Sequence, residues 1–203
     1  MKGFIAFVFA AAASAAHANL LINGSFENTA NFTPDGNNTM SLAAGSTAMT
    51  GWTTSVNEIA WIKDPNPFNL TASEGIFSLD LMGYHDFQPT GMISQSFGTV
   101  IGSTYTVSFD IGRGTHLVVS AGGTTVNRFN GNNTAQPFWN TETFTFVAAA
   151  NTATLTVQGG ANTNPQYAGV DNLIVDGDAV PEPATLAIIA AGLAAIAKRR
   201  KSR

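Results

Sequence analysis

Alternation of apolar and polar residues with a period of two is the feature that most limits the fold of this chain. In the stretch TYTVSFDIG, Tyr105, Val107, Phe109 and Ile111 alternate with threonine, serine and aspartate. The stretches TATLTVQ and FSLDLM alternate in the same way. Because successive side chains of a strand point to opposite faces, each stretch predicts a β-strand with one buried face.

Shorter stretches of the same kind predict further strands. They lie at residues 20–22, 51–56, 59–62, 93–97, 116–120, 125–129, 142–147 and 170–175. Gly122-Gly123 predicts a tight hairpin turn, and Asn28 to Thr50 reads as a long connection over one edge. No stretch between the two ends reads as a long amphipathic helix. The pattern therefore predicts an all-β fold, an antiparallel β-sandwich.

The first 18 residues have the pattern of a secretory signal peptide. Lys2 precedes an uncharged apolar run, and Ala16-His17-Ala18 is a small-x-small site for cleavage after Ala18. The alternative is an N-terminal anchor helix, but the run is about half the roughly 20 residues that a membrane span needs. We therefore expect residues 1–18 to form a signal helix, which is removed on export.

The last 25 residues, 179–203, have the pattern of a second targeting segment. An apolar run from Ala184 to Ala197 ends at a basic cluster, and as a helix it would be roughly 21 Å long. That is short for a bilayer core of about 30 Å, although snorkelling basic side chains would narrow the gap. Basic residues stay on the cytoplasmic side, so we expect a transient inner-membrane anchor with the domain outside.

The order of these features resembles the PEP-CTERM sorting signal of Gram-negative bacteria. The matching residues are Val180, Pro181, Glu182, Pro183, Lys198, Arg199 and Arg200. This resemblance implies an exosortase-type processing enzyme as a partner, and delivery to the cell surface or extracellular matrix. A hydrophobic tail that is later removed would hold the cleavage site at the membrane.

The region between the signals is acidic and contains no cysteine. Residues 19–183 hold all thirteen acidic residues but only Lys63, Arg113 and Arg128 as basic ones, which gives a formal charge of −10. Such a surface repels phosphate backbones, so nucleic acid is not expected as a partner. Disulfides and thiolate metal sites are excluded.

Several segments of residues 19–178 together resemble the galactose-binding-like jelly roll, in particular the DUF642 and choice-of-anchor C group. They are NLLINGSFE (19–27), GW (51–52), SLDL (78–81), ISQSF (93–97), YTVSFDIG (105–112) and AGVDNLIV (168–175). The resemblance implies a jelly-roll β-sandwich between the signal helix and the C-terminal hydrophobic helix. It also implies a structural Ca²⁺ that ties the first strand to the last through Glu27 and Asp171. The alternative is that Glu27 caps a turn and Asp171 accepts backbone hydrogen bonds.

A sugar site would require aromatic rings beside polar side chains. The candidates are Trp61, Tyr84, Arg113, Trp139 and Tyr167, with His85, Asp86 and Asn140 as polar neighbours. Core or edge packing is the alternative for the aromatic residues, and Trp52 is expected in the core. The acidic loop Asp64 to Glu74 is expected to be solvated.

Catalytic motifs are absent from the sequence, which contains no G-x-S-x-G, H-E-x-x-H, P-loop or G-x-G-x-x-G. We therefore expect a non-enzymatic surface or matrix protein that acts in adhesion or in association with exopolysaccharide. The alternative is a carbohydrate-binding module with a defined sugar groove. A hydrolase is the third hypothesis, because jelly rolls also host enzymes.

Overall fold

The computed structural model describes residues 19–86, 88–131, 139–160 and 167–177. These residues form eleven strands and no helix, which confirms the all-β prediction. The strands are β1 (Thr39–Leu42), β2 (Thr53–Ser55), β3 (Ile59–Lys63), β4 (Phe77–Asp80), β5 (Met92–Gly98), β6 (Thr104–Gly112), β7 (His116–Ala121), β8 (Thr124–Phe129), β9 (Trp139–Val147), β10 (Thr152–Gly159) and β11 (Gly169–Asp176). The predicted signal helix and C-terminal hydrophobic helix lie outside the described residues.

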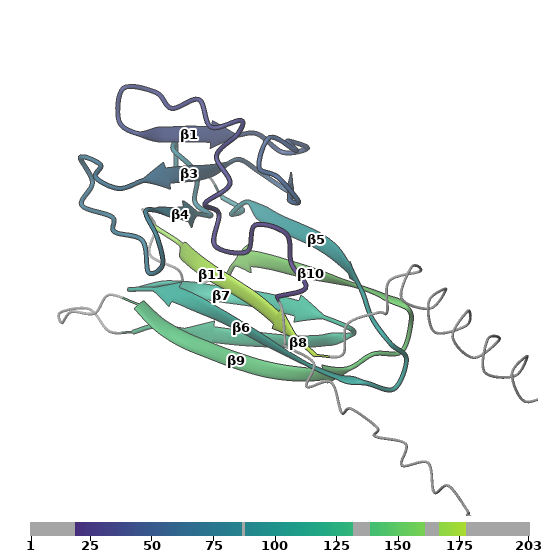
Figure 1. Ribbon diagram of the computed structural model, residues 1–203. Helices are drawn as coiled ribbons and strands as arrows, with labels where there is room; N and C mark the ends of the chain where they lie inside the picture. Colours follow the sequence, from purple (N-terminus) through teal and green to yellow (C-terminus); the bar gives the residue numbers. More distant parts are fainter. Residues whose placement is uncertain (1–18, 87, 132–138, 161–166, 178–203) are drawn as a thin grey trace, which may run out of the picture.

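Two antiparallel sheets face each other (Figure 1). The six-stranded sheet has the order β1-β3-β4-β11-β6-β9, and the five-stranded sheet has the order β2-β5-β10-β7-β8. Gly122 and Gly123 form the β7–β8 turn as predicted, both with positive φ, a backbone conformation that glycine adopts without steric cost.

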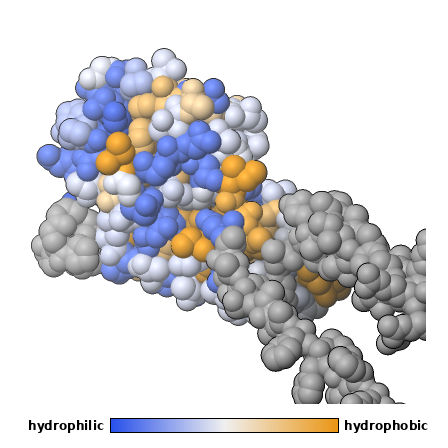
Figure 2. All heavy atoms as spheres, in the orientation of Figure 1, coloured by the Kyte–Doolittle hydropathy of each residue, from blue (hydrophilic) through white to orange (hydrophobic). Residues whose placement is uncertain are grey.

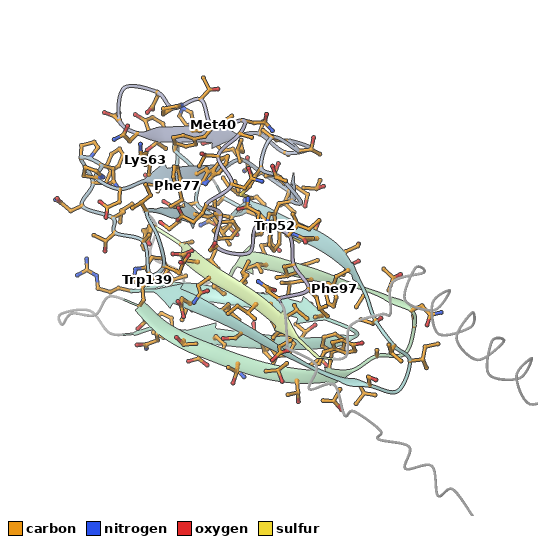
Figure 3. The ribbon with its side chains drawn as sticks, in the orientation of Figure 1. Met40, Trp52, Lys63, Phe77, Phe97 and Trp139 are labelled. Atoms are coloured by element: carbon orange, nitrogen blue, oxygen red, sulfur yellow. The ribbon has the colours of Figure 1, made fainter. Side chains whose placement is uncertain are left out.

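Apolar side chains from the inner faces of both sheets form the core. Tyr105, Val107, Phe109 and Ile111 are all fully buried, as the alternation in β6 predicts. Trp52 is also buried, which confirms its expected place in the core. Figure 3 shows Phe97 and Trp139 near opposite ends of the sandwich, and Figure 2 shows that one outer face is a mixture of polar and apolar patches.

Two predictions about strands near the N-terminus are wrong. Residues 20–22 form turns rather than a strand, although Leu20 N–H donates to the carbonyl of Val175 in β11. The expected long connection from Asn28 to Thr50 contains β1, which pairs with β3. Strand β1 has only four residues, and a segment that short offers too few alternating positions to stand out from its polar surroundings.

The segment between β3 and β4, residues 64–76, packs on the outer face of the six-stranded sheet. Polar side chains on this face are buried, with Asp80 4%, Asp110 6% and Asp171 0% exposed. Ser73 N–H and its hydroxyl both contact Asp171, at 2.8 and 3.0 Å. The prediction of a solvated loop is confirmed for residues 64–74, of which none is buried and 65, 67–69, 71 and 74 are exposed, but contacts of Ser73 with buried carboxylates also anchor the segment to the sheet.

Candidate functional site

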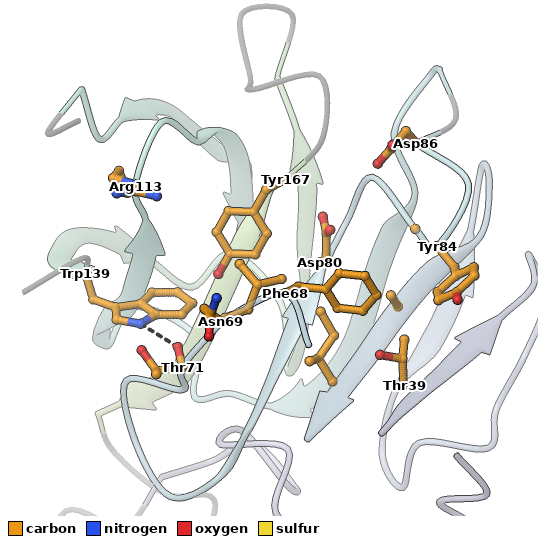
Figure 4. Close-up of a pocket in the computed structure, with 14 residues that line it drawn as sticks. Thr39, Phe68, Asn69, Thr71, Asp80, Tyr84, Asp86, Arg113, Trp139 and Tyr167 are labelled. Carbon is orange, nitrogen blue, oxygen red and sulfur yellow. Dashed lines mark hydrogen bonds between the residues drawn. The ribbon is translucent and has the colours of Figure 1, made fainter. Parts of the chain in front are cut away.

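A cavity of about 450 Å³ lies on the outer face of the six-stranded sheet, beside the 64–76 segment (Figure 4). Its aromatic lining comes from separate parts of the chain: Phe68, Tyr84, Trp139 and Tyr167. Its polar lining includes Asn69, Thr71, Asp80, Asp86 and Arg113. Rings interleaved with polar groups are the composition expected of a site for a small polar ligand.

The 64–76 segment builds one wall of this cavity. Asn66 organises the segment, since its side-chain oxygen accepts N–H bonds from Phe68 and Leu70, at 3.2 and 3.1 Å. At the far end of the wall, the indole N–H of Trp139 donates to the carbonyl of Thr71 at 2.9 Å. Hydrogen bonds within the segment and one from Trp139 on β9 therefore hold this wall in place.

Four of the five predicted ligand-binding residues line this cavity: Tyr84, Arg113, Trp139 and Tyr167. Trp61 does not, so the prediction for this residue is wrong. Its side chain points to the inner face of β3, is 0% exposed, and packs edge-on against Phe32 with ring centroids 5.0 Å apart. Both faces of β3 are buried, so its sequence does not alternate between apolar and polar residues. The sequence therefore could not predict which face Trp61 occupies.

Tyr167 stands at the middle of the cavity, between Trp139 and Asp80 (Figure 4). A side chain at Gly169 or at Gly112 would collide with the Tyr167 ring, so these two glycines let the ring lie against β6 and β11. Burial raises the pKa of the Tyr167 phenol well above its usual value, and the nearby Asp80 and Asp171 raise it further. The phenol is therefore neutral, a hydroxyl able to donate and accept.

Tyr84 lies at the other end of the cavity, on the loop between β4 and β5. Its ring meets Phe68 edge-on, and its hydroxyl accepts a hydrogen bond from the side chain of Asn37 at 2.8 Å. Glu58 tethers the same loop, accepting from the N–H of His85 at 3.0 Å and lying 2.7 Å from its Nδ1. His85 thus binds Glu58 rather than facing a ligand.

Asp80 is, with Phe68, Asn69 and Thr71, among the lining residues that the sequence did not predict. Its Oδ1 accepts N–H bonds from Met82 and Ala168, at 2.9 and 2.8 Å. Within the described part of the chain Oδ2 has no hydrogen-bond partner, although the residue is 4% exposed. Burial raises the pKa of Asp80 to about 7, and the charge of Asp86 adds to the rise while the two N–H donors oppose it.

The two predicted calcium ligands bind backbone and hydroxyl groups instead. Glu27 Oε1 accepts from the N–H groups of Ile76 and Phe77, at 2.8 and 2.7 Å. Asp171 accepts from Ser73 and Asn172, among other donors. Residues 19–177, apart from the undescribed gaps, contain no group of three or more His, Cys, Asp or Glu that could hold a metal.

These contacts are those of the alternative, in which both carboxylates accept hydrogen bonds. Oxygens already occupied by N–H and O–H donors fit poorly to an ion that takes six to eight oxygen ligands. Calcium at Glu27 and Asp171 stays a prediction. The same contacts join residues near both ends of the domain to the 64–76 segment and to β4.

Asp171 and Asp110 face each other in the β6–β11 pairing, with the Ser73 hydroxyl between them. The hydroxyl oxygen lies 2.7 Å from Asp110 Oδ2 and 3.0 Å from Asp171 Oδ2, yet it carries one proton. Burial raises the pKa of Asp171 to about 7, against the opposing effect of its N–H donors. A second proton, held on Asp171, would complete this set of hydrogen bonds.

The protein-family comparison covers most of this sandwich. The family described as "Protein of unknown function (DUF642)" matches residues 19–175. The chain belongs to the DUF642 family. A second match, to the PEP-CTERM protein-sorting motif, covers residues 179–201. It includes the predicted motif residues Val180 to Pro183 and Lys198 to Arg200, which lie outside the described residues.

Solved structures share the fold of this DUF642 domain at low sequence identity. An apo cyclase from Fischerella sp. is 14% identical, with a TM-score of 0.56, and the match covers 83% of this chain and 100% of the cyclase. An arabinose-bound α-L-arabinofuranosidase, MgGH51, is 17% identical with a TM-score of 0.50, over 79% of this chain and 26% of the enzyme. At these identities the likeness shows the β-sandwich fold alone.

One curated protein resembles part of the sequence. Halomucin of Haloquadratum walsbyi is 35% identical over 102 residues, which are 50% of this chain and 1% of halomucin. The chain thus spans a very small part of that protein. In the part of the chain that the structure describes, no helix is long and apolar enough to cross a membrane.

Proposed function

We propose that this DUF642 protein is exported, sorted to the cell surface by its PEP-CTERM motif, and binds a saccharide in the outer-face cavity. The location rests on the sorting motif at residues 179–201, since that motif directs proteins to the surface. The sandwich would then act in adhesion or in association with exopolysaccharide, after an exosortase-type enzyme has processed the tail. A Gram-negative source and a transient inner-membrane anchor belong to this proposal.

One observation carries the saccharide proposal. Four aromatic rings from four different segments converge on one cavity, together with two carboxylates, a guanidinium and an amide. Sugars present apolar C–H faces and a rim of hydroxyls, so they are bound by rings that stack and by polar groups at the edges. A cavity of about 450 Å³ lies within the range of small-molecule sites.

Calorimetry with the mature domain and a panel of soluble polysaccharides and their oligosaccharides tests this proposal. We expect at least one saccharide to bind, and Trp139→Ala to weaken that binding at least about tenfold, because the stacking surface is lost. The matched control is Phe129→Ala, an aromatic truncation at an exposed position on β8. Absence of binding to the whole panel, or equal binding by Trp139→Ala, would overturn it.

A second candidate function is acid catalysis in the same cavity, and it rests on Asp80. A buried carboxyl group with a pKa of about 7 can hold a proton at neutral pH and donate it to a bound molecule, as a general acid does. Incubation with the same saccharides, followed by product analysis, separates the two functions. Turnover that Asp80→Asn abolishes would establish the enzyme, and binding without turnover supports the binding module.

A further inference from the structure

The two ends of the cavity differ in charge. Figure 4 shows Arg113 beside Trp139 on one side of Tyr167, and Asp80 and Asp86 on the other side. Asp80 and Asp86 both line the cavity at this end. We call the end formed by Asp80, Asp86, Tyr84 and Phe68 the acidic end.

Resting on the proposed saccharide function, we propose that the acidic end binds the ammonium group of an amino sugar whose nitrogen carries no acetyl group. Such a ligand would place its amine against Asp80 Oδ2 and Asp86, with its ring stacked among the aromatic side chains.

One carboxylate oxygen of Asp80, Oδ2, is open to a ligand. Among the described residues nothing donates to Oδ2, although the residue is only 4% exposed. Oδ2 is not among the fully enclosed side-chain atoms that lack a partner, and Asp80 lines the cavity, so a ligand in the cavity can donate a hydrogen bond to this oxygen. Oδ1 already has two N–H donors, so Oδ2 is the atom left to the ligand.

The presence of two acidic side chains decides which kind of hydrogen-bond donor fits this end of the cavity. A sugar hydroxyl would donate to Oδ2 but would bring no positive charge to the two acidic side chains. An ammonium group provides three N–H donors and a positive charge, and charge-assisted hydrogen bonds are about twice as strong as neutral ones. The side chain of Asp86 is exposed at the same end of the cavity, so both carboxylates would gain from one cation.

The surroundings favour a cation as well. The rings of Phe68 and Tyr84, with centroids 6.3 Å apart, stand at this end of the cavity, and a cation near such ring faces is stabilised by the π system. The formal charge of −10 on residues 19–183 attracts cations over a longer range. A uronic acid would instead meet two carboxylates of its own charge.

Calorimetry at about pH 7 with three disaccharides of one backbone geometry tests the inference: the glucosamine dimer, its di-N-acetyl form and cellobiose. We expect the glucosamine dimer to bind at least about tenfold more tightly than the other two, since they lack the ammonium group. We also expect added salt to weaken only the glucosamine dimer.

Two variants keep the test independent of folding. Asp80→Asn keeps the acceptor for Met82 and Ala168 but removes the charge, and Asp86→Asn changes an exposed residue; each should abolish the preference for the amine. Glu142→Gln, on β9 outside the cavity lining, is the control and should retain it. Equal binding of all three disaccharides would overturn this inference and leave the saccharide proposal standing. Absence of binding to any saccharide of either panel overturns both.

Discussion

The buried Asp80 predicts an inverse dependence of stability on pH. The folded protein raises the pKa of this carboxyl from 3.8 to about 7, so the folded state holds the proton more tightly than the unfolded chain. The stabilising contribution is therefore complete below about pH 4 and is lost as the pH rises through about 7. A shift of about three pH units corresponds to about 4 kcal/mol at most.

Urea denaturation of the mature domain at about pH 5 and about pH 8 measures this effect. Of the total, about 2.5 kcal/mol is expected to be lost between these two pH values, because Asp80 is still almost fully protonated at the lower one and mostly ionised at the higher one. Asp80→Asn, which cannot ionise, should reduce the wild-type loss by that amount and should be more stable than the wild type at the higher pH.

Asp171, whose pKa burial also raises to about 7, would still titrate in the Asp80→Asn variant, so some loss should persist. Glu142→Gln is the control, since this acid is partly exposed and pairs with Arg128 on the surface. If Asp80→Asn loses as much stability over this pH interval as the wild type does, the reasoning about its protonation is refuted.

Three further predictions concern the core, the 64–76 segment and calcium, and a fourth concerns processing. Trp61→Ala should cost about 3–5 kcal/mol in urea denaturation, because it empties a fully buried core position; a loss below about 1 kcal/mol would contradict this. Ser73→Ala should cost about 1–3 kcal/mol, because Asp110 and Asp171 lose their shared hydroxyl, whereas the control Ser96→Ala, at an exposed site on β5, should cost less; equal losses would argue against the role of Ser73. Calcium at Glu27 and Asp171 predicts a Tm that falls when EDTA is added, and an unchanged Tm refutes the site. Intact mass of protein recovered from the cell surface should show loss of residues 1–18 and of the tail near Pro181 to Pro183; a full-length mass contradicts both processing predictions.

The inner-facing residues of the strands could be predicted from the sequence because burial on one face leaves a period of two. Strand β6 shows this, since all four of its predicted inner residues are fully buried. The rule fails where both faces are covered. In β4, Phe77 and Leu79 face the core, but Asp80 on the opposite face is also buried and accepts a hydrogen bond from Ala168, 88 residues away in the chain. No local pattern predicts such a long-range contact.

The cavity was only half predictable for the same reason. Aromatic residues near polar ones were visible in the sequence, and four of the five predicted residues meet in one place. The sequence could not predict that Asp80 lines the cavity, because its position in FSLDLM is that of a solvent-facing residue on a strand with one buried face. Its burial depends on contacts distant in the chain, such as the hydrogen bond from Ala168, which is 88 residues away.

Carboxylates on the outer face thus serve two purposes within one sheet. One oxygen of Asp110 and one of Asp171 accept from the 64–76 segment and hold it against β6 and β11, while their other oxygens accept from Thr141 and Asn172. Asp80, one strand away on β4, shares the same cover but keeps one oxygen open to the cavity. The segment that donates to the first two also lines, through residues 68–71, the cavity that the third one faces. A ligand that donates to Asp80 Oδ2 would also lie against residues 68–71 of the segment that Ser73 anchors. Binding of the amine is therefore expected to stabilise the 64–76 segment.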